Sequence, residues 1–199
     1  MISVEYVLAD PEFRPQRSVD RSGALDIKAY LPELPDADIL ASVQAKYQTF
    51  HQEYPQGCLY INGKKIDTEL TIDLLRQSEP QRRFFSLAPG EHKIVSAGFK
   101  VGLSTNEPDK IAVMLVCSRS GLACKYGITV INSPGIVDEH YPDWVGVGVI
   151  NHGRDLHLFS HGARIAQVMY IEACMAQESI VTELTIVGER SGGFGHTGI

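Results

Sequence analysis

The sequence predicts an all-β fold, an antiparallel sandwich or barrel, with one mixed segment inserted into it. From residue 87 onward, short apolar runs alternate with turns rich in Gly, Pro and Asn, and no long helical pattern interrupts them. This spacing is typical of antiparallel β proteins. The rhythm breaks between residues 32 and 85. With 199 residues, of which 44% are hydrophobic and 21% charged, the chain can bury one sizeable core.

The expected strands follow in chain order. Ile2, Val4, Tyr6 and Leu8 occupy alternate positions, which predicts a half-buried first strand. Further strands are expected between turn residues, at 91–103, 110–117, 127–131, 144–150, 156–160, 164–173 and 179–188. We therefore assign residues 1–31 and 86–188 to a β domain, and the glycine-rich residues 189–199 to a flexible C-terminal arm.

The segment 32–85 is expected to be an insertion of mixed structure. Apolar residues at helical spacing predict a helix over 36–54: Ile39, Leu40, Val43, Tyr47 and Phe50. Asn62-Gly63 predicts a type I′ hairpin turn, and 69–83 fits either a helix or a strand. Two interpretations remain open. The insertion folds on its own small apolar face between two strands, or it is a module that binds an unknown protein partner or shapes an oligomer.

Bulk properties exclude several classes of protein. A formal net charge of −6 argues against a general nucleic-acid or acidic-membrane binder. The longest apolar run, 111–117, is too short to span a bilayer, and the N-terminus does not resemble a signal peptide. Four cysteines without C-x-x-C spacing indicate neither zinc nor a disulfide framework, which fits a cytoplasmic location. We expect His157 and His161 to be surface polar residues rather than metal ligands.

Reactive residue types are concentrated in residues 117–141. Arg119, Ser120 and Gly121 can offer a guanidinium, a hydroxyl and an N–H to one phosphate group, or they form a plain β-turn with an exposed arginine. The stretch 132–141 is predicted to be a hairpin tip. Asp138, expected where a strand begins, can orient and deprotonate a water or stabilise the hairpin as an Asx-type acceptor.

Three further positions leave alternatives open. Tyr141 is either a core aromatic or a stacking platform. Gln167, between two apolar neighbours, needs a hydrogen-bonding partner if it is buried, and that partner is either structural or a ligand. The glycine-rich tail is either a frayed terminus or a flap that closes over an anion while Phe194 stacks on a flat group.

Five segments in order resemble the boxes of the trimeric dUTPase family, and the resemblance covers residues about 20–31 and 87–199. In chain order they are "SGALDIKA", "SRSGLACKYGI", "NSPGIVDEHY", "GARIAQ" and "GGFGHTG". The resemblance implies a jelly-roll-like β-barrel that assembles as a homotrimer with shared active sites. It also implies hydrolysis of dUTP to dUMP and diphosphate, with Mg²⁺ chelated by the triphosphate.

The resemblance also implies roles for single residues. Asp138 would activate the water that attacks the α-phosphorus, and Asp26 would lie near the water shell of the metal. Tyr141 would pack under the deoxyribose. The remaining substrate-binding positions fall into four groups: the phosphate turn Arg119, Ser120 and Gly121; the uracil-reading residues Asn132, Gly135, Ile136 and Val137; Gln167 near the phosphates; and the arm residues Arg190, Phe194, Gly195 and His196.

The chain departs from the family pattern at several positions. Ala163 stands where the fourth box has a carboxylate, Arg190 is shifted by one residue, Ser118 replaces a proline, and Pro142-Asp143 replaces the usual turn. A related dCTP deaminase would need a glutamate on the strand after the third box, and 144–150 contains none. A nucleotide-gated regulatory protein, with the insertion binding a partner, is the alternative from another class.

Overall fold

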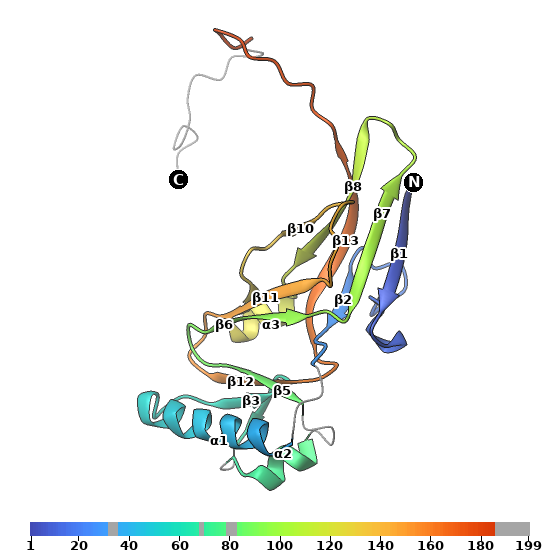
Figure 1. Cartoon of the computed structure of the whole chain (residues 1–199). Coiled ribbons are helices and arrows are strands. Elements are labelled where there is room, and N and C mark those ends of the chain that lie inside the picture. The colour runs from blue at the N-terminus through green and yellow to red at the C-terminus, as the bar shows by residue number, and fades with distance from the viewer. Residues whose placement is uncertain (32–35, 68–69, 79–82, 186–199) are drawn as a thin grey trace.

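The computed structural model describes residues 1–31, 36–67, 70–78 and 83–185, and it is mostly β (Figure 1). The predicted all-β class is confirmed. The strands are β1 (Ile2–Leu8), β2 (Leu25–Lys28), β3 (Leu59–Ile61), β4 (Lys64–Ile66), β5 (Phe84–Leu87), β6 (His92–Ser96), β7 (Phe99–Thr105), β8 (Lys110–Cys117), β9 (Ile128–Val130), β10 (Gly135–Val137), β11 (Gly146–Asn151), β12 (Leu156–Ser160) and β13 (Arg164–Cys174). The helices are α1 (Asp36–Glu53), α2 (Ile72–Ser78), α3 (Ser120–Tyr126) and a 3₁₀ turn at Pro11–Phe13.

The strands form separate sheets that pack around a shared core. The sheet orders are β1–β7, β10–β8–β13–β2, β6–β11–β9 and β4–β3–β12–β5. Within the described residues these sheets do not close into a single barrel, so the jelly-roll-like expectation holds at the level of packed β-sheets. The main hydrophobic core takes side chains from β2 and from β5 through β13, and Phe99, Met114 and Val145 are fully buried in it.

The sheet β10–β8–β13–β2 matters most for function because its outward face carries charged and polar side chains. Register partners on neighbouring strands share a face. Gln167 pairs with Asp26 on β2 and with Cys117 on β8, so these three residues form one outward row. The adjacent outward row consists of apolar residues: Met169, Leu115 and Ile136.

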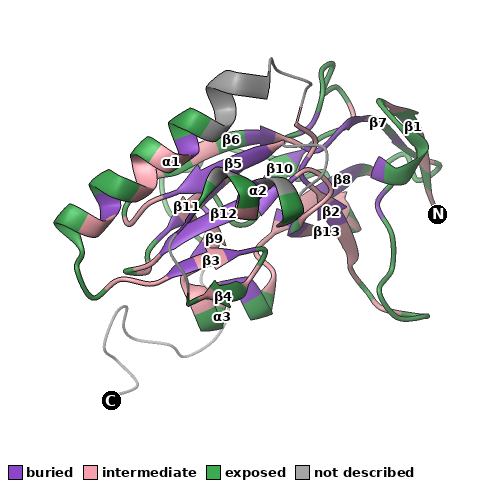
Figure 2. Ribbon diagram, turned by 90° about the horizontal axis from the view of Figure 1, so that it is seen from below, coloured by how far each residue is buried: buried purple, intermediate pink, exposed green. Residues whose placement is uncertain are grey.

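The insertion covers the second face of β12. β3 pairs in parallel with β12, and the two helices pack over this sheet (Figure 2). A second apolar cluster forms between them, and it includes Phe50, Leu75 and Leu158. The predicted helix and the Asn62-Gly63 hairpin are confirmed, and Asn62 and Gly63 both have positive φ, 50° and 80°. The apolar face of the insertion is therefore shared with the β domain rather than closed on itself.

A salt bridge ties the insertion to a turn of the β domain. Lys46 on α1 donates to both carboxylate oxygens of Glu91, and the backbone N–H of Ala88 donates to the same carboxylate. Burial on its own would raise the pKa of Glu91, but the hydrogen bonds from Lys46 and Ala88 and the charge of Lys93 outweigh it and hold the pKa below its ordinary value.

Four expectations about the β domain need correction. Residues 120–126 form helix α3 rather than a β-turn. The strands that flank the third-box loop do not pair with each other: β9 pairs with β11 and β10 with β8. The two strands therefore belong to different sheets, β9 to β6–β11–β9 and β10 to β10–β8–β13–β2. The expected strand 91–103 breaks at Gly98, where φ is 73°. The described part of 179–188, residues 179–185, forms no strand.

The expectation that His157 and His161 lie on the surface is also wrong. His157 on β12 is 1% exposed, because the insertion covers this strand. Its ring stacks on Tyr60 at 5.0 Å between centroids. The side chain of His161 is 7% exposed, and its Nδ1 accepts a hydrogen bond from the backbone N–H of Leu31. Both residues serve packing.

Beyond β13 the chain leaves the body of the molecule. Figure 1 shows residues 175–185 running outward as an extended segment. Ile180, Val181 and Leu184 on this segment are exposed. Among the described residues, no helix has the length and apolar character needed to cross a membrane.

Candidate functional site

Asp26 on β2 lies at the centre of a charged cluster on the outward face. The Nε of Arg119 donates to its Oδ1 at 2.9 Å, and an Nη of Arg164 donates to its Oδ2 at 3.0 Å. The side chain of Asp26 is only 13% exposed. Charge-assisted hydrogen bonds to both oxygens fix the carboxylate and orient the two guanidinium groups. The first, second and fourth boxes therefore meet at one carboxylate.

Ser118 and Gln167 hold the second-box turn in place. The Nε2 of Gln167 donates to the carbonyl oxygen of Ser118 at 3.0 Å. The N–H of Ser118 donates to the hydroxyl of Ser133, and its own hydroxyl accepts the N–H of Val130 at 2.9 Å. A proline at position 118 would have neither the N–H nor the hydroxyl. Ser118, which departs from the family pattern, thus links the second, third and fourth boxes. The hydrogen-bonding partner of Gln167 is therefore a structural one.

Ser120 and Gly121 begin helix α3 directly after Arg119. Within the described residues, Arg119 at the N-cap makes no side-chain capping hydrogen bond. Gly121 has no atom within 4 Å of the position that a Cβ would occupy. The turn is thus open toward solvent, and its backbone N–H groups can approach an anion.

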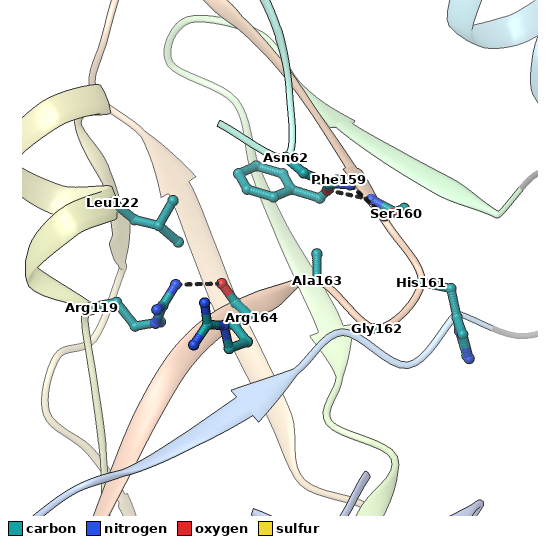
Figure 3. Close-up of a pocket in the computed structure, with 9 residues that line it drawn as sticks. All are labelled: Asn62, Arg119, Leu122, Phe159, Ser160, His161, Gly162, Ala163 and Arg164. Carbon is teal, nitrogen blue, oxygen red and sulfur yellow. Dashed lines mark hydrogen bonds between the residues drawn. The ribbon is translucent and has the colours of Figure 1, made fainter. Parts of the chain in front are cut away.

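A cavity of about 330 Å³ lies beside this turn (Figure 3). Arg119 and Arg164 form its cationic side, and Leu122, Phe159 and Ala163 supply apolar surface. The absence of a carboxylate at Ala163 leaves the two arginines as the dominant charges of the wall. Asn62, from the hairpin of the insertion, also lines the cavity, and its amide exchanges hydrogen bonds with Ser160.

The third-box loop builds a second, separate cavity of about 210 Å³. It is lined by Asn132, Gly135, Ile136, Val137, Tyr141 and four neighbours from β8, β9 and β11. Gly135 makes room for the amide of Asn132, because a Cβ at position 135 would lie 3.2 Å from its nitrogen. Among the described residues, this cavity shares no lining residue with the one beside Arg119.

Asp138 follows the end of β10 rather than beginning a strand. Its Oδ1 accepts the backbone N–H of His140 at 3.0 Å, an Asx-type turn that ends the strand. The side chain is exposed, so the carboxylate retains lone pairs for a water. The hydroxyl of Tyr141 donates to the carbonyl oxygen of Trp144 at 3.1 Å, which holds its ring at the rim of the cavity.

The four arm positions, Arg190, Phe194, Gly195 and His196, lie outside the described residues. In the described part of the chain, no group of three or more His, Cys, Asp or Glu side chains is placed to hold a metal ion. Among these residues Asp26 thus has no partner carboxylate for direct ligation, and both of its oxygens already accept a hydrogen bond from an arginine.

Comparison with known proteins identifies this arrangement. The family model described as dUTPase matches residues 83–198, more than half of the chain. The chain belongs to the dUTPase family. A deoxyuridine 5'-triphosphate nucleotidohydrolase of Desulfotalea psychrophila is 40% identical to it over 114 residues, which cover 57% of this chain and 73% of that relative.

Solved dUTPase structures share the fold. The Staphylococcus bacteriophage 80alpha dUTPase with dUpNHpp superposes with a TM-score of 0.61 at 17% identity and covers 99% of both chains. A mutant dUTPase from phage phi11 of S. aureus, described with a structural Mg(II) ion, has a TM-score of 0.54 at 14% identity, over 91% of this chain and 97% of that one.

Three residues of the site were not predicted from the sequence. Arg164 lies inside the fourth box, but no role was assigned to it from the sequence, and its pairing with Asp26 spans 138 residues. Ser118 was identified only as a departure from the family pattern. Asn62 belongs to the insertion, and no local signal placed it beside the phosphate turn. Alternation along β2 and β13 puts Asp26 and Gln167 outward, but their register is not encoded locally.

Proposed function

We propose that this protein hydrolyses dUTP to dUMP and diphosphate, which limits uracil incorporation into DNA and supplies dUMP. The observation that carries the proposal is the meeting of three boxes at Asp26. Arg119 and Arg164 are held beside the Ser120-Gly121 turn, where a triphosphate would find two guanidinium groups and backbone N–H donors. Membership of the dUTPase family supports the same reaction.

Asp138 is the proposed general base. Its carboxylate takes a proton from a water, and the resulting hydroxide attacks the α-phosphorus. The bond from the α-phosphorus to the bridging oxygen breaks, and that oxygen leaves with diphosphate. Phosphoanhydride hydrolysis needs positioning and charge neutralisation more than covalent assistance. The exposed carboxylate, fixed by the His140 N–H, suits this role.

The cavity of about 210 Å³ is the proposed nucleoside site. Backbone groups of residues 132–137 would recognise uracil, and the close packing around Gly135 supports exclusion of the methyl group of thymine. Tyr141 would pack under the deoxyribose and disfavour a 2′-hydroxyl. Phe194 in the arm would cover the base, with Arg190, Gly195 and His196 closing over the phosphates.

The donor set fits Mg²⁺ that arrives on the triphosphate. A lone carboxylate whose oxygens already accept hydrogen bonds cannot chelate the ion alone, but it can accept hydrogen bonds from metal-bound water. Bound in this way, Mg²⁺ would neutralise the charge of the phosphate groups. The residues of this chain then orient the phosphates and hold the attacking water.

The protein is also proposed to act as a homotrimer in the cytoplasm. Ile111, Ile136, Met169 and Ile171 are exposed on the outward face of β10–β8–β13, an apolar patch suited to a neighbouring copy. The extended segment 175–185 supports contact with such a copy, and the separation of the two cavities supports sites shared between subunits. Sedimentation velocity measures the number of chains in the assembly.

The proposed cytoplasmic location is supported by the four free cysteines, which suit a reducing compartment.

The decisive experiment is turnover of the purified protein with dUTP, dCTP and dTTP in the presence of Mg²⁺. The proposal expects release of diphosphate from dUTP and from neither of the other nucleotides. Release of ammonia from dCTP would instead indicate a deaminase. Equal turnover of dTTP would contradict the assignment of the 132–137 loop as the base-reading element.

A regulatory protein whose insertion binds a partner is the second candidate, and one contact favours it. The hydroxyl of Tyr126 at the end of α3 donates to the carbonyl oxygen of Gly63 in the insertion at 2.8 Å. The helix that begins at the phosphate turn thus ends on the insertion. Tight binding of dUTP with negligible turnover would favour this candidate over the enzyme.

A further inference from the structure

A compact group of basic residues lines a small cavity beside Asp26. Four cationic side chains line a cavity of about 80 Å³: Arg14, Arg17, Lys28 and Arg164. Asp26 is the only carboxylate among the described residues that line it. This concentration of positive charge is notable because the whole chain carries a formal charge of −6.

Within the described residues, two of the four cations have no carboxylate partner. Lys28 lies 3.5 Å from Glu12, and Arg164 lies 3.0 Å from Asp26. In the described part of the chain, neither Arg14 nor Arg17 forms an ion pair or a side-chain hydrogen bond, and both are exposed. Their guanidinium groups therefore keep their full capacity for an external anion.

The backbone that carries Arg14 is held on both sides. Phe13 is 1% exposed and packs edge-on against Tyr30 with centroids 5.1 Å apart. Pro15 is buried. Gln16 then forms a bridge with Asp26, with the N–H of Asp26 donating to the carbonyl oxygen of Gln16 at 2.7 Å. A fixed backbone lowers the entropy lost when the side chain binds a ligand.

This cavity adjoins the proposed phosphate site. Arg164 lines both this cavity and the larger one that contains Arg119. Asp26 lies between the two arginines of the phosphate side and contacts both. An anionic group that reaches past Arg164 would therefore meet Arg14 and Arg17 next.

We propose that Arg14 and Arg17 form a subsite for the diphosphate portion of the substrate and for the diphosphate product. Arginine binds phosphate oxygens in a bidentate manner, and two arginines that form no ion pair with the described residues match a group with several negative charges. The 80 Å³ cavity admits a phosphoryl group beside Arg164. The inference rests on the proposed hydrolysis of dUTP, but it concerns residues outside the five boxes.

The test measures diphosphate binding to the full chain by titration calorimetry in buffer with Mg²⁺. The double variant Arg14→Gln/Arg17→Gln removes both guanidinium groups. We expect its dissociation constant for diphosphate to rise about tenfold or more, the effect of losing charge-assisted contacts. Its affinity for dUMP, which lacks the distal phosphates, should stay within about twofold of wild type.

The matched control is Arg21→Gln/Arg154→Gln, which removes the same net charge from two exposed arginines outside the cavity. It should bind diphosphate within about twofold of wild type. Unchanged diphosphate affinity in the Arg14/Arg17 variant overturns the subsite, and so does an equal loss in both double variants. A melting curve shared with wild type separates lost binding from lost folding.

The titration tests the subsite independently of the hydrolysis assay, so the failure of one proposal can be distinguished from the failure of the other. Suppose that the wild-type chain does not hydrolyse dUTP, and that of the two double variants only the Arg14/Arg17 variant loses affinity for diphosphate. The subsite is then supported and the proposed reaction is contradicted. If dUTP is hydrolysed and diphosphate affinity does not depend on Arg14 and Arg17, the reaction stands and the subsite falls.

Discussion

The two hydrophobic clusters of this protein contrast in what they support. The main cluster lies between the sheets of the β domain. The strands around it carry Asp26 and Gln167, and the segments that follow β8 and β10 carry Arg119 and Asp138. The second cluster lies between α1, α2 and β12, and its described members are apolar packing residues. β12 belongs to both, because its residues are buried on each face.

The two regions therefore make different contributions to the protein: the β domain carries the proposed chemistry, and the insertion adds stability. The proposed chemistry depends on side chains at the ends and outward faces of the β domain, where replacements need not disturb packing. The insertion contributes mainly buried apolar surface, and it reaches the site at Asn62 and Gly63. Changes in the β domain should therefore affect activity, whereas changes in the insertion should affect stability.

The largest expected effect comes from Asp138→Asn. The amide oxygen can still accept the N–H of His140, so the turn should persist, but the amide cannot accept a proton from water. We expect the rate of dUTP hydrolysis to fall by about a thousandfold, within the range for loss of a general base. Dissociation constants for a non-hydrolysable dUTP analogue should stay near wild type.

Thermal unfolding provides the control for Asp138→Asn. An unchanged melting temperature together with lost turnover would sharpen the contrast between the two regions. Wild-type turnover would remove Asp138 from the proposed mechanism. A large fall in melting temperature would show that the turn supports folding as well as chemistry.

The next effect concerns Phe50→Ala in the insertion. Phe50 is 2% exposed, and its ring fills the space beside Gly57, where a Cβ would lie 2.4 Å from it. Loss of a buried phenyl ring should lower the free energy of unfolding by about 3 kcal/mol. Urea denaturation measures this loss. The exposed Gln48→Ala on the same helix is the matched control, with little expected change.

Activity of the Phe50→Ala variant decides what the insertion does for the site. At a temperature where the variant is folded, we expect kcat and KM for dUTP to remain near wild type. A loss of turnover in the folded variant would contradict the different contributions of the two regions. It would instead indicate that the insertion positions α3 through the contact between Gly63 and Tyr126.

How far the sequence could predict this molecule depends on whether the signal is local. Alternation along residues 2–8 and 164–173 identified β1 and β13, and Asn62-Gly63 identified a hairpin, because these patterns depend on neighbouring residues. Helix α3 was missed because its seven residues are too few to establish a helical period and follow a stretch that also fits a β-turn.

The missed features of the site are non-local. Asp26 receives Arg119 and Arg164 from positions 93 and 138 residues away, and this depends on the register of β13 between β2 and β8. The five boxes identified Asp26 and Arg119 as members of one site through a family resemblance, without giving their contact. The burial of His157 was not predictable, because it results from the pairing of β3 with β12.

The smallest expected effect at neutral pH concerns His157, where the two clusters meet. Burial lowers its pKa to about 4 against the opposing charge of Asp155, and within the described residues neither ring nitrogen has a hydrogen-bond partner. The rings of Tyr60 and Tyr126 pack against it, and burial raises the pKa of Tyr60 above its ordinary value. Between pH 6.5 and 4 the unfolded chain binds a proton that the folded chain does not. The free energy of unfolding should therefore decrease as the pH is lowered across this window.

The variant His157→Phe tests this expectation, because it replaces the imidazole by an aromatic ring that cannot be protonated. At pH 4.5 it should remove about 2 kcal/mol of acid-induced destabilisation, and above pH 6.5 it should leave the slope of stability against pH unchanged. The matched control is the exposed His152→Phe. The stability that Glu91 contributes is lost at lower pH, as the pH falls through its lowered pKa. If stability had the same slope against pH in His157→Phe and His152→Phe between pH 4 and 6.5, the lowered pKa of His157 would be contradicted. The imidazole would then be hydrogen-bonded to water in the folded protein, and β12 would not be a fully dehydrated strand between the two clusters.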